Sequence, residues 1–587
     1  MDNIYIANVF HEIADILELK GEDNFRIGAY RRAAQTIESL PQNIEEIAQQ
    51  GRLKEIPGIG ESIAEKIDEI LKTGRLHYLE ELRKTIAPGL VVMLGIAGLG
   101  PKTVLKLNKE FGVETLEDLE RLLPLHKICK LKGFGEKSEE NIKKGLEQFK
   151  RHKERGLLGK VEPQGQAIVQ ELEKIEGVDK VSLAGSLRRM KETIGDIDIL
   201  CTSKKPKKVI DTFCTLPQVK EVKAKGTTKA VIILKTGIEA DLRVVEPEAY
   251  GAALHYFTGN KSHNIKVRTL GVKRGLKINE YGIFKKSKEQ RAKIKEKRIG
   301  GWTEEEVFKA VGLPYIEPEL REDRGEIEAA FEGKLPHLIK LSDIKGDLHT
   351  HTKYSDGHFS IEEMAKAALQ KGYQYILITD HTTTVGITHG MDEEKIKRQM
   401  EEIDQLNYKF QNPKSKFKIL KGVECDIRSD GTLDLPDKIL EKLDIVVASI
   451  HSKFGMDQTD RLIKACQNPN VDIIGHPTGR KLGERDPYQV DLDKIMDVCK
   501  QTNTFLELNA FWDRLDLNDV NCRKAKEKGL KIVISTDAHH VLELDVMRFG
   551  IATARRGWLE KEDVINTLPL EQLLNLFGKG GKRIQNL

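Results

Sequence analysis

Asp196 and Asp198 are the first pair of residues in this sequence that could do chemistry together. They lie in the apolar run 196–201, and a strand would point both carboxylates to the same face. Two carboxylates at that spacing repel each other unless a cation lies between them. A third carboxylate, Asp241, stands in a second strand-like run, residues 238–245. Oxygen ligands of this kind suit Mg²⁺ or Mn²⁺, often together with the phosphates of a substrate.

A glycine turn with two arginines precedes the aspartate pair. Residues 185–189 are Gly-Ser-Leu-Arg-Arg, and Ser186 lies ten residues before Asp196. An Asp-x-Asp pair alone is common at solvated strand ends, but this turn and Asp241 favour a catalytic interpretation. The Gly-Ser turn and Arg189 would hold a triphosphate while the carboxylates hold metal ions. The pattern is therefore typical of a nucleotidyltransferase.

Histidines and carboxylates form a second constellation in the C-terminal part of the chain. The set contains six histidines and three carboxylates at or near the ends of apolar runs: His349, His351, Asp356, His381, Glu424, His451, His476, Asp537 and His539. One such histidine is commonly a core or surface residue, but nine together predict a metal centre. Imidazole and carboxylate without thiolate suit Zn²⁺, Mn²⁺ or Fe²⁺, and nine ligands fit two or three ions with a carboxylate bridge. Clustered ions activate water and clamp a phosphoryl group, so we expect phosphoester hydrolysis.

The elements that must position these residues follow from hydrophobic periodicity. Residues 1–85 carry apolar side chains at three- and four-residue spacing and are predicted to be helical. From about residue 160 the pattern is mixed α/β, and from residue 344 about seven strand-like runs alternate with helical ones. We expect a parallel barrel there, with its site at the carboxyl ends of the strands. Residues 316–340, rich in Glu, Pro and Arg, are predicted to be an interdomain linker.

A hydrophobic-Gly-hydrophobic-Gly repeat occurs three times in the helical part. The copies, residues 56–60, 96–100 and 131–135, each precede a helical pattern. Glycines at such turns let a DNA phosphate approach the backbone N–H groups that start the next helix, where the helix dipole favours an anion. This contact binds phosphate and reads no bases. We expect DNA-backbone contacts at Gly58, Gly60, Gly98, Gly100, Gly133 and Gly135.

Length and composition set further limits. A chain of 587 residues is too long for one core and should form several domains. The net charge of +4 hides an asymmetry, because residues 1–340 carry +7 and residues 341–587 carry −3. The N-terminal part is therefore the expected polyanion binder. Seven cysteines without a Cys-x-x-Cys pair argue against disulfides, and the sequence shows neither a signal peptide nor a membrane-length apolar run. We expect a soluble, cytoplasmic protein without a membrane partner.

These motifs resemble those of a known family. The first 315 or so residues resemble the family X DNA polymerases, the DNA polymerase beta group, and the last 245 or so resemble a PHP (polymerase and histidinol phosphatase) domain. Supporting motifs are Tyr-Phe-Thr-Gly at 256–259, Asn264 with Arg268, and Ile-Asn-Glu-Tyr at 278–281. The resemblance to the bacterial and archaeal members covers nearly the whole chain.

The resemblance implies a multidomain fold of helical helix-hairpin-helix domains, an α/β nucleotidyltransferase palm and thumb, and a distorted (β/α)7 PHP barrel. We expect residues 1–85 to form a helical DNA-binding domain like the 8-kDa domain of that group, with one helix-hairpin-helix. Further segments would be the fingers (86–155) with two more hairpin copies, the palm (156–250), the thumb (251–315), the linker (316–340) and the PHP domain (341–575).

The resemblance also implies residue roles in the palm and thumb. Asp196, Asp198 and Asp241 would carry two ions, Mg²⁺ or Mn²⁺, one at the primer 3′-hydroxyl and one at the incoming triphosphate. Contacts to the nucleotide and the nascent base pair are expected from Gly185, Ser186, Arg189, Tyr256, Phe257, Gly259, Asn264 and Arg268.

In the PHP part, the family pattern implies up to three ions, Mn²⁺ or Zn²⁺. The first would bind His349, His351, Glu424 and Asp537, the second Glu424, His451 and His476, and the third Asp356, His381 and His539. Glu424 is thus expected to be a bridging and catalytic carboxylate.

Three positions depart from the DNA polymerase beta pattern. Lys66 falls on the lysine that forms the Schiff base of the deoxyribose-phosphate lyase, but Ser62 and Arg26 stand where that group has further lysines. A nucleophilic lysine needs a lowered pKa, so the sequence predicts weak lyase chemistry at Lys66. Glu239 replaces an arginine near the third carboxylate, which predicts a different hold on the primer end.

The sequence therefore predicts a monomeric DNA-directed DNA polymerase that fills short gaps during repair, with gapped or nicked DNA and dNTPs as partners. Its PHP domain would supply a 3′–5′ exonuclease, with abasic-site endonuclease or related end processing. One alternative is a PHP small-molecule phosphatase that carries a DNA-binding module and a weak polymerase site. A second alternative is a scaffold that binds DNA ends with little catalysis.

Overall fold

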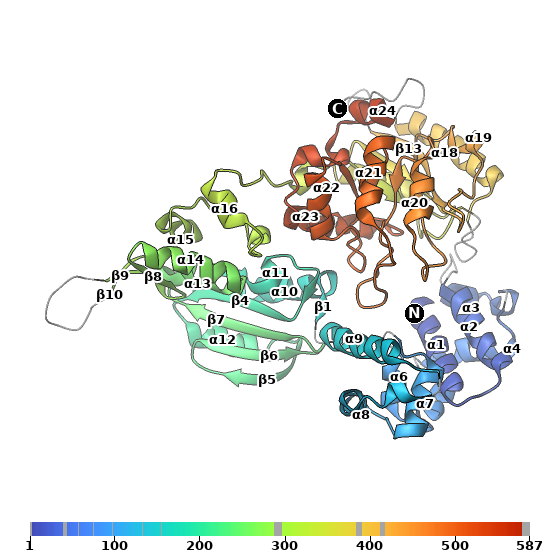
Figure 1. Cartoon of the computed structure of the whole chain (residues 1–587), viewed down its shortest axis with the longest axis horizontal. Coiled ribbons are helices and arrows are strands. Elements are labelled where there is room, and N and C mark those ends of the chain that lie inside the picture. Colours follow the sequence, from blue (N-terminus) through green and yellow to red (C-terminus); the bar gives the residue numbers. More distant parts are fainter. Residues whose placement is uncertain are drawn as a thin grey trace.

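The computed structural model describes residues 3–38, 44–56, 58–73, 75–94, 96, 98–131, 133–153, 155–286, 296–382, 390–410 and 417–577. From the N-terminus the chain passes through two groups of helices, a five-stranded sheet, a mixed helical region and a seven-stranded barrel (Figure 1). No helix in these described ranges combines the length and apolar character needed to cross a bilayer.

Two helical cores precede the sheet. The first contains α1 (Asn3–Leu19), α2 (Asn24–Glu38), α3 (Ile44–Gln49), α4 (Glu61–Thr73) and α5 (His77–Lys84). The second contains α6 (Pro88–Met93), α7 (Pro101–Phe111), α8 (Leu116–Leu122) and α9 (Glu136–Lys153). Both cores use the apolar faces that the three- and four-residue spacing predicts.

The three glycine repeats adopt one backbone conformation. Gly58, Gly98 and Gly133 have φ values of +83°, +90° and +90°, in the left-handed region that glycine enters without strain. The second glycine of each copy immediately precedes a helix, and its carbonyl accepts the first hydrogen bonds of α4, α7 and α9. The N–H groups of each helix start are therefore left for an external acceptor, as in a helix-hairpin-helix.

A mixed sheet in the order β2-β4-β7-β6-β5 follows the helices. Its strands are β2 (Val178–Leu183), β4 (Asp196–Ser203), β5 (Val219–Lys225), β6 (Lys229–Leu234) and β7 (Glu239–Val245). Helices α10 (Leu158–Glu173) and α12 (Pro206–Cys214) pack on it (Figure 1). The central pair, β4 and β7, is parallel, so both strands present their N-terminal carboxylates at one edge.

The next region contains α13 (Tyr250–Thr258), α14 (Lys261–Lys273), the antiparallel strands β8 (Leu276–Asn279), β9 (Gly282–Lys286) and β10 (Glu296–Gly300), and α15 (Glu304–Ala310). Residues 316–340 contain η5 (Pro318–Leu320) and α16 (Glu326–Phe331). This segment is packed, because Arg321 and Glu326 are fully buried. Arg321 pairs with Glu304 at 2.6 Å, and Glu326 pairs with His263 at 2.7 Å.

The C-terminal part is a seven-stranded parallel sheet in sequential order, curled into a nearly closed barrel. Its strands are β11 (Gly346–Thr350), β12 (Tyr375–Ile378), β13 (Lys418–Asp426), β14 (Ile445–Ser449), β15 (Ile473–Ile474), β16 (Phe505–Asn509) and β17 (Ile532–Ser535). A parallel bridge between Thr350 and Ala538 joins the first and last strands. The predicted parallel barrel is thereby confirmed.

Helices surround this barrel and close one end. Those on the outside are α17 (Ile361–Gln370), α18 (Glu393–Phe410), α19 (Asp437–Leu440), α20 (Thr459–Cys466), α21 (Leu492–Thr502), α22 (Asp519–Glu527) and α23 (Met547–Arg556). Leu573 and Phe577 of α24 (Leu570–Phe577) pack with apolar residues that begin the strands, such as Leu420 and Val533. That end is sealed, so polar side chains of the barrel gather at the opposite, carboxyl end.

Two candidate metal sites

The palm carboxylates meet because of strand register. In the parallel pair β4–β7, Asp198 lies directly opposite Asp241, and Asp196 lies opposite Glu239. Adjacent strands are about 4.8 Å apart, which places the carboxylates within reach of a shared cation. Burial raises the pKa of Asp198 to about 7, and the negative charges of Asp196 and Asp241 add to this effect. Oδ2 of Asp241 is paired with Nζ of Lys229 at 2.8 Å, and its buried Oδ1 has no hydrogen-bond partner in the described structure, so that oxygen is available to a divalent cation.

Gly185 allows the turn of residues 185–189 to lie against this site. Its φ is +58°, and a Cβ atom added there would lie 2.0 Å from Oδ2 of Asp198. The N–H of Ala184 also donates to the carbonyl of Asp198 at 2.8 Å. A residue with a side chain would therefore displace either the turn or the carboxylate.

A pocket of about 670 Å³ opens beside the carboxylates. Its walls include Asp196, Asp198 and all eight predicted nucleotide contacts: Gly185, Ser186, Arg189, Tyr256, Phe257, Gly259, Asn264 and Arg268. Three cations to which no sequence motif pointed also line it: Arg155, Lys191 and Lys261. Burial lowers the pKa of Lys191; Glu322 opposes that shift, while Arg556 and Arg189 add to it. Such a group of cations suits a polyanionic ligand.

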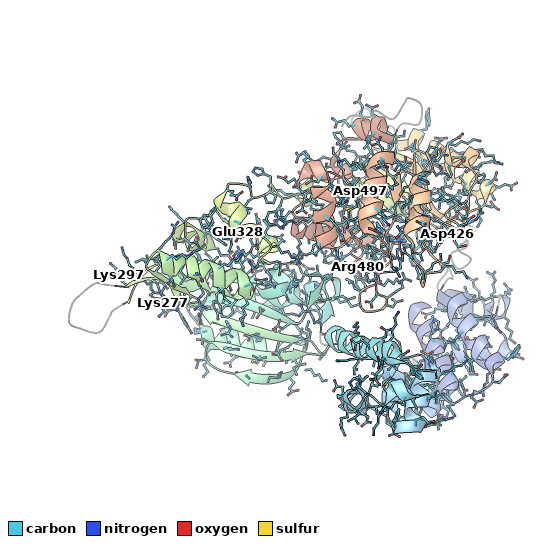
Figure 2. All side chains as sticks on the ribbon, viewed as in Figure 1. Lys277, Lys297, Glu328, Asp426, Arg480 and Asp497 are labelled. Carbon is cyan, nitrogen blue, oxygen red and sulfur yellow. The ribbon has the colours of Figure 1, made fainter. Side chains whose placement is uncertain are left out.

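Arg189 reaches this pocket from an ion-pair network that crosses into the barrel domain. Its Nε donates to Oε1 of Glu322 at 3.0 Å, and its Nη1 donates to the carbonyl of Thr258. Arg556, in α23 of the barrel, donates to the carbonyl of Arg189 at 2.8 Å and to Glu322 at 3.0 Å. Arg480, which Figure 2 labels on the barrel, makes a second link through Glu192 at 2.8 Å. The barrel domain is therefore in direct contact with the palm turn.

Glu424 lies at the centre of the second site. Its Oε2 is 3.4 Å from Nε2 of His349, 3.6 Å from Nε2 of His351 and 3.0 Å from Nδ1 of His381. Its Oε1 is 3.2 Å from Nε2 of His451 and 3.0 Å from Nε2 of His476. The two oxygens thus face different groups of histidines, which is the arrangement that a bridging carboxylate requires.

The nine predicted ligands converge on this centre. Ligand atoms close enough to share one ion occur in three groups: His349, His351, Glu424 and Asp537; His381, Glu424 and His451; and His351, Asp356, His381 and His539. His476 contacts Glu424 beside the second group. The first group is the set that the family pattern implies. The second contains His381 where the pattern has His476, and the third contains His351 in addition to its three expected ligands.

Several buried imidazole nitrogens at this centre lack a hydrogen-bond partner within the described ranges. They are Nε2 of His349, both ring nitrogens of His351, Nδ1 of His381 and Nδ1 of His476. Buried polar atoms normally find a partner, so these nitrogens and the adjacent carboxylates fit bound cations. The donors are nitrogen and oxygen only, which suits Mn²⁺ or Zn²⁺.

A second set of polar residues orients the ligands, and the sequence argument missed it. Glu507 accepts a hydrogen bond from Nδ1 of His349 at 2.7 Å, which turns Nε2 toward Glu424. Asp426, labelled in Figure 2, lies 3.2 Å from Nδ1 of His451 and acts in the same way. Against burial, Glu424 and then Asp426 raise the pKa of His451 to about 9. Glu507 alternates along β16 with Leu506 and Leu508 and so points inward with Phe505 and Asn509. This alternation is the sequence signal that could have identified Glu507.

Lys66 lies apart from both sites, in α4 of the first helical core. Its Nζ donates to Oγ of Ser62 at 2.9 Å and stands 5.2 Å from the centre of the Tyr78 ring. Burial lowers the pKa of Lys66; Glu65 opposes this, and Arg26 adds to the lowering. The family pattern has a lysine at the position of Arg26, so the sequence left open whether a cation would stand beside Lys66. In the structure Arg26 supplies part of that positive charge.

Comparisons with known proteins cover nearly the whole chain. Family models match a helix-hairpin-helix domain at residues 1–76, a SAM-like helix-hairpin-helix tandem at 91–148, the DNA polymerase beta thumb at 253–322 and a PHP domain at 347–511. The "DNA polymerase/3'-5' exonuclease PolX" of Bacillus subtilis (strain 168) is 41% identical over 97% of this chain and 98% of its own length. The chain belongs to the family X DNA polymerases. It is a member that carries helix-hairpin-helix and PHP domains, as the sequence predicts.

Other relatives match just over a third of this family X chain. A probable phosphatase of Thermoanaerobacter sp. (strain X514) is 36% identical over 38% of this chain and 89% of its own length. A probable phosphatase of Caldanaerobacter subterraneus subsp. tengcongensis is 37% identical over 35% of this chain and 80% of its own length.

Proposed function

We propose that this family X member is a DNA-directed DNA polymerase that fills short gaps in DNA repair and trims DNA ends with a PHP 3′–5′ exonuclease. The observation that carries the proposal is the presence, in one chain, of three candidate metal-binding groups in the barrel and of a separate pocket beside the carboxylates of β4. The pocket is lined by a glycine turn and several cations, and the metal-binding groups lie at the carboxyl end of the barrel. The full-length similarity to the Bacillus subtilis enzyme supports both activities.

For the polymerase reaction, Asp196, Asp198 and Asp241 would hold two ions, Mg²⁺ or Mn²⁺. Bound there, such ions favour the ionised primer 3′-hydroxyl and neutralise the triphosphate. The turn at Gly185 and Ser186, with Arg189, would bind the triphosphate. Tyr256 and Phe257 would pack against the sugar, and Asn264 and Arg268 would contact the base pair and the template.

For hydrolysis, the nine PHP residues would hold up to three ions, Mn²⁺ or Zn²⁺. Bound ions of this kind supply a hydroxide near neutral pH and stabilise the leaving oxygen. Glu507 and Asp426 keep His349 and His451 in the orientation that binding needs. The same site would serve abasic-site cleavage or other end processing.

DNA would be held mainly through its backbone. The three hairpins, at Gly58 and Gly60, Gly98 and Gly100, and Gly133 and Gly135, lie in the half of the chain with positive charge. They would grip phosphates on gapped or nicked DNA, with dNTPs as the second substrate. We propose a cytoplasmic, monomeric enzyme.

The test is a one-nucleotide-gapped duplex incubated with the full chain and Mn²⁺, with and without dNTPs. We expect primer extension with dNTPs and primer shortening without them. Shortening without extension would instead support a PHP phosphoesterase with a DNA-binding module. Neither product, with the duplex still bound, would support a scaffold and contradict the proposal.

A further inference from the structure

Arg514 is a cationic side chain beside the PHP metal ligands that the sequence argument did not use. It lies in the loop after β16, and only 17% of its side chain is exposed. Its Nε is 3.6 Å from Oδ2 of Asp537, which is too long for a hydrogen bond. Among the described residues, no atom accepts a hydrogen bond from the Arg514 guanidinium. Its donors are therefore available to a ligand at the metal centre.

The loop fixes where this guanidinium stands. The N–H groups of Arg514 and Leu515 both donate to the carbonyl of Phe511, at 2.8 and 3.0 Å. Asn509 and Asp516 exchange two backbone hydrogen bonds across the base of the loop. The carboxylate of Asp516 is itself held by Thr478, at 2.9 Å from its hydroxyl. Arg514 thus projects from a closed loop rather than from a free end of chain.

Two of the acidic groups around Arg514, Asp537 and Glu424, already have other partners, and a third, Asp513, is not hydrogen-bonded to the guanidinium. Oδ2 of Asp537 accepts a hydrogen bond from Nδ2 of Asn509 at 3.0 Å, and Oδ1 lies 3.1 Å from Nε2 of His351. Both oxygens of Glu424 face histidines. A guanidinium stays protonated in proteins, so Arg514 carries a positive charge here. The charge has near neighbours but no hydrogen-bonded counter-ion among the described side chains.

A second guanidinium, that of Arg485, lies close enough to Arg514 for the two charges to interact. Arg485 stacks on Phe454, with 4.0 Å between its Cζ and the ring centre, and its Nε donates to the carbonyl of Gly479. Burial lowers the pKa of Arg485, and the positive charge of Arg514 adds to this. Two partly buried cations that repel each other, one of them 3.6 Å from Asp537, indicate a place for an anion.

We propose that Arg514 is a catalytic residue of the PHP site that binds the scissile phosphate of a DNA 3′ end. This inference rests on the proposed exonuclease function and deepens it. In the reaction, the oxygen of water bonds to phosphorus, and the bond from phosphorus to the 3′-oxygen of the preceding nucleotide breaks. That oxygen takes up a proton, and a nucleoside 5′-monophosphate leaves. Arg514 donates hydrogen bonds to the non-bridging oxygens throughout and exchanges no proton.

Asn509 provides the matched control, because it contacts the same oxygen of Asp537 without carrying a charge. If Arg514 only oriented Asp537, then Arg514→Gln and Asn509→Ala would have the same consequences. Both would weaken metal binding, and neither would respond to an added guanidinium ion. If Arg514 binds phosphate, Arg514→Gln and Asn509→Ala should differ in metal content, and only a variant that lacks Arg514 should respond to added guanidinium.

The experiment uses full-length wild type, Arg514→Gln, Arg514→Ala and Asn509→Ala. Exonuclease rates are measured with Mn²⁺ on a 5′-labelled single strand without dNTPs, together with bound metal and competitive inhibition by dAMP. We expect the Arg514 variants to keep wild-type metal content, to lose about 100-fold in kcat and to bind dAMP about 10-fold more weakly. Guanidinium chloride should restore part of the rate of Arg514→Ala and none of the rate of Asn509→Ala.

Loss of metal from the Arg514 variants in parallel with Asn509→Ala would overturn the proposal, as would unchanged dAMP inhibition. Absence of exonuclease activity in wild type would instead contradict the proposed function. The two failures are therefore distinguishable. Every variant should still fill gaps, because the polymerase residues lie in another domain. This activity serves as the control that each protein is folded.

Discussion

Replacing Gly185 by alanine should disable polymerisation while leaving exonuclease activity intact. The new Cβ atom would lie 2.0 Å from Oδ2 of Asp198, whereas such contacts essentially never fall below 3.0 Å. The turn or the carboxylate must therefore move by about 1 Å, and a displacement of that size at a reacting group costs about 100-fold in rate. Gap filling of a one-nucleotide gap under single-turnover conditions measures this loss.

Gly177→Ala is the matched control in the same domain. Gly177 also has a positive φ, +88°, so both substitutions carry similar backbone strain of about 1–2 kcal/mol. A Cβ atom at Gly177 would meet Lys205 at an ordinary 3.6 Å. We expect Gly177→Ala to fill gaps at nearly the wild-type rate. A rate for Gly185→Ala within about threefold of Gly177→Ala would refute the steric argument.

Four further predictions concern individual side chains. Asp198→Ala should abolish nucleotide addition and spare the nuclease, because the two metal-ligand sets share no residue; near-normal extension would mean that the palm site is misassigned. Burial raises the pKa of Asp198 to about 7, so protons compete with metal below that value, and the Mg²⁺ concentration for half-maximal gap filling should rise as pH falls from about 8 to about 6; a flat profile would contradict this. Glu424→Ala should lose exonuclease activity by several orders of magnitude and lose bound metal while polymerisation survives, with His540→Ala as a mild control; full exonuclease activity in Glu424→Ala would exclude the PHP assignment. Because burial and Arg26 lower the pKa of Lys66, borohydride should trap Lys66 on incised abasic DNA, less so in Arg26→Ala and not at all in Lys66→Ala; equal trapping in all three proteins would place the lyase nucleophile elsewhere.

Much of the architecture was predictable because its signals are local. Period-two alternation placed Asp196 and Asp198 on one face of a strand, and three glycine repeats marked three hairpins whose first glycines share a positive φ. The barrel ligands were recognisable since each strand of a parallel barrel ends at the same rim. These features need only a few consecutive residues to be visible.

Other features depend on contacts between distant segments. The opposition of Asp198 and Asp241 is a matter of register between β4 and β7, which no single run of sequence encodes. Glu507 acts on His349 across 158 positions, and its acidic side chain within an apolar strand was the one visible clue. Residues 316–340 have the composition of a linker, but Arg321 and Glu326 are buried by partners in earlier helices. The composition of such a segment predicts that it is solvated, but it does not show which residues the segment packs against.

The network of Arg189, Glu322 and Arg556 bears on whether the two catalytic halves are separable modules. A fragment that ended at residue 315 would keep Arg189 and lose both Glu322 and Arg556. A fragment that ended at residue 340 would keep Glu322 but lose Arg556, which donates hydrogen bonds to Glu322 and to the Arg189 carbonyl. Removing one partner of a buried ion pair is costly, so either cut would loosen the triphosphate turn itself. A PHP domain exchanged between relatives would therefore have to be transferred together with partners that match Arg189, Glu322 and Arg556.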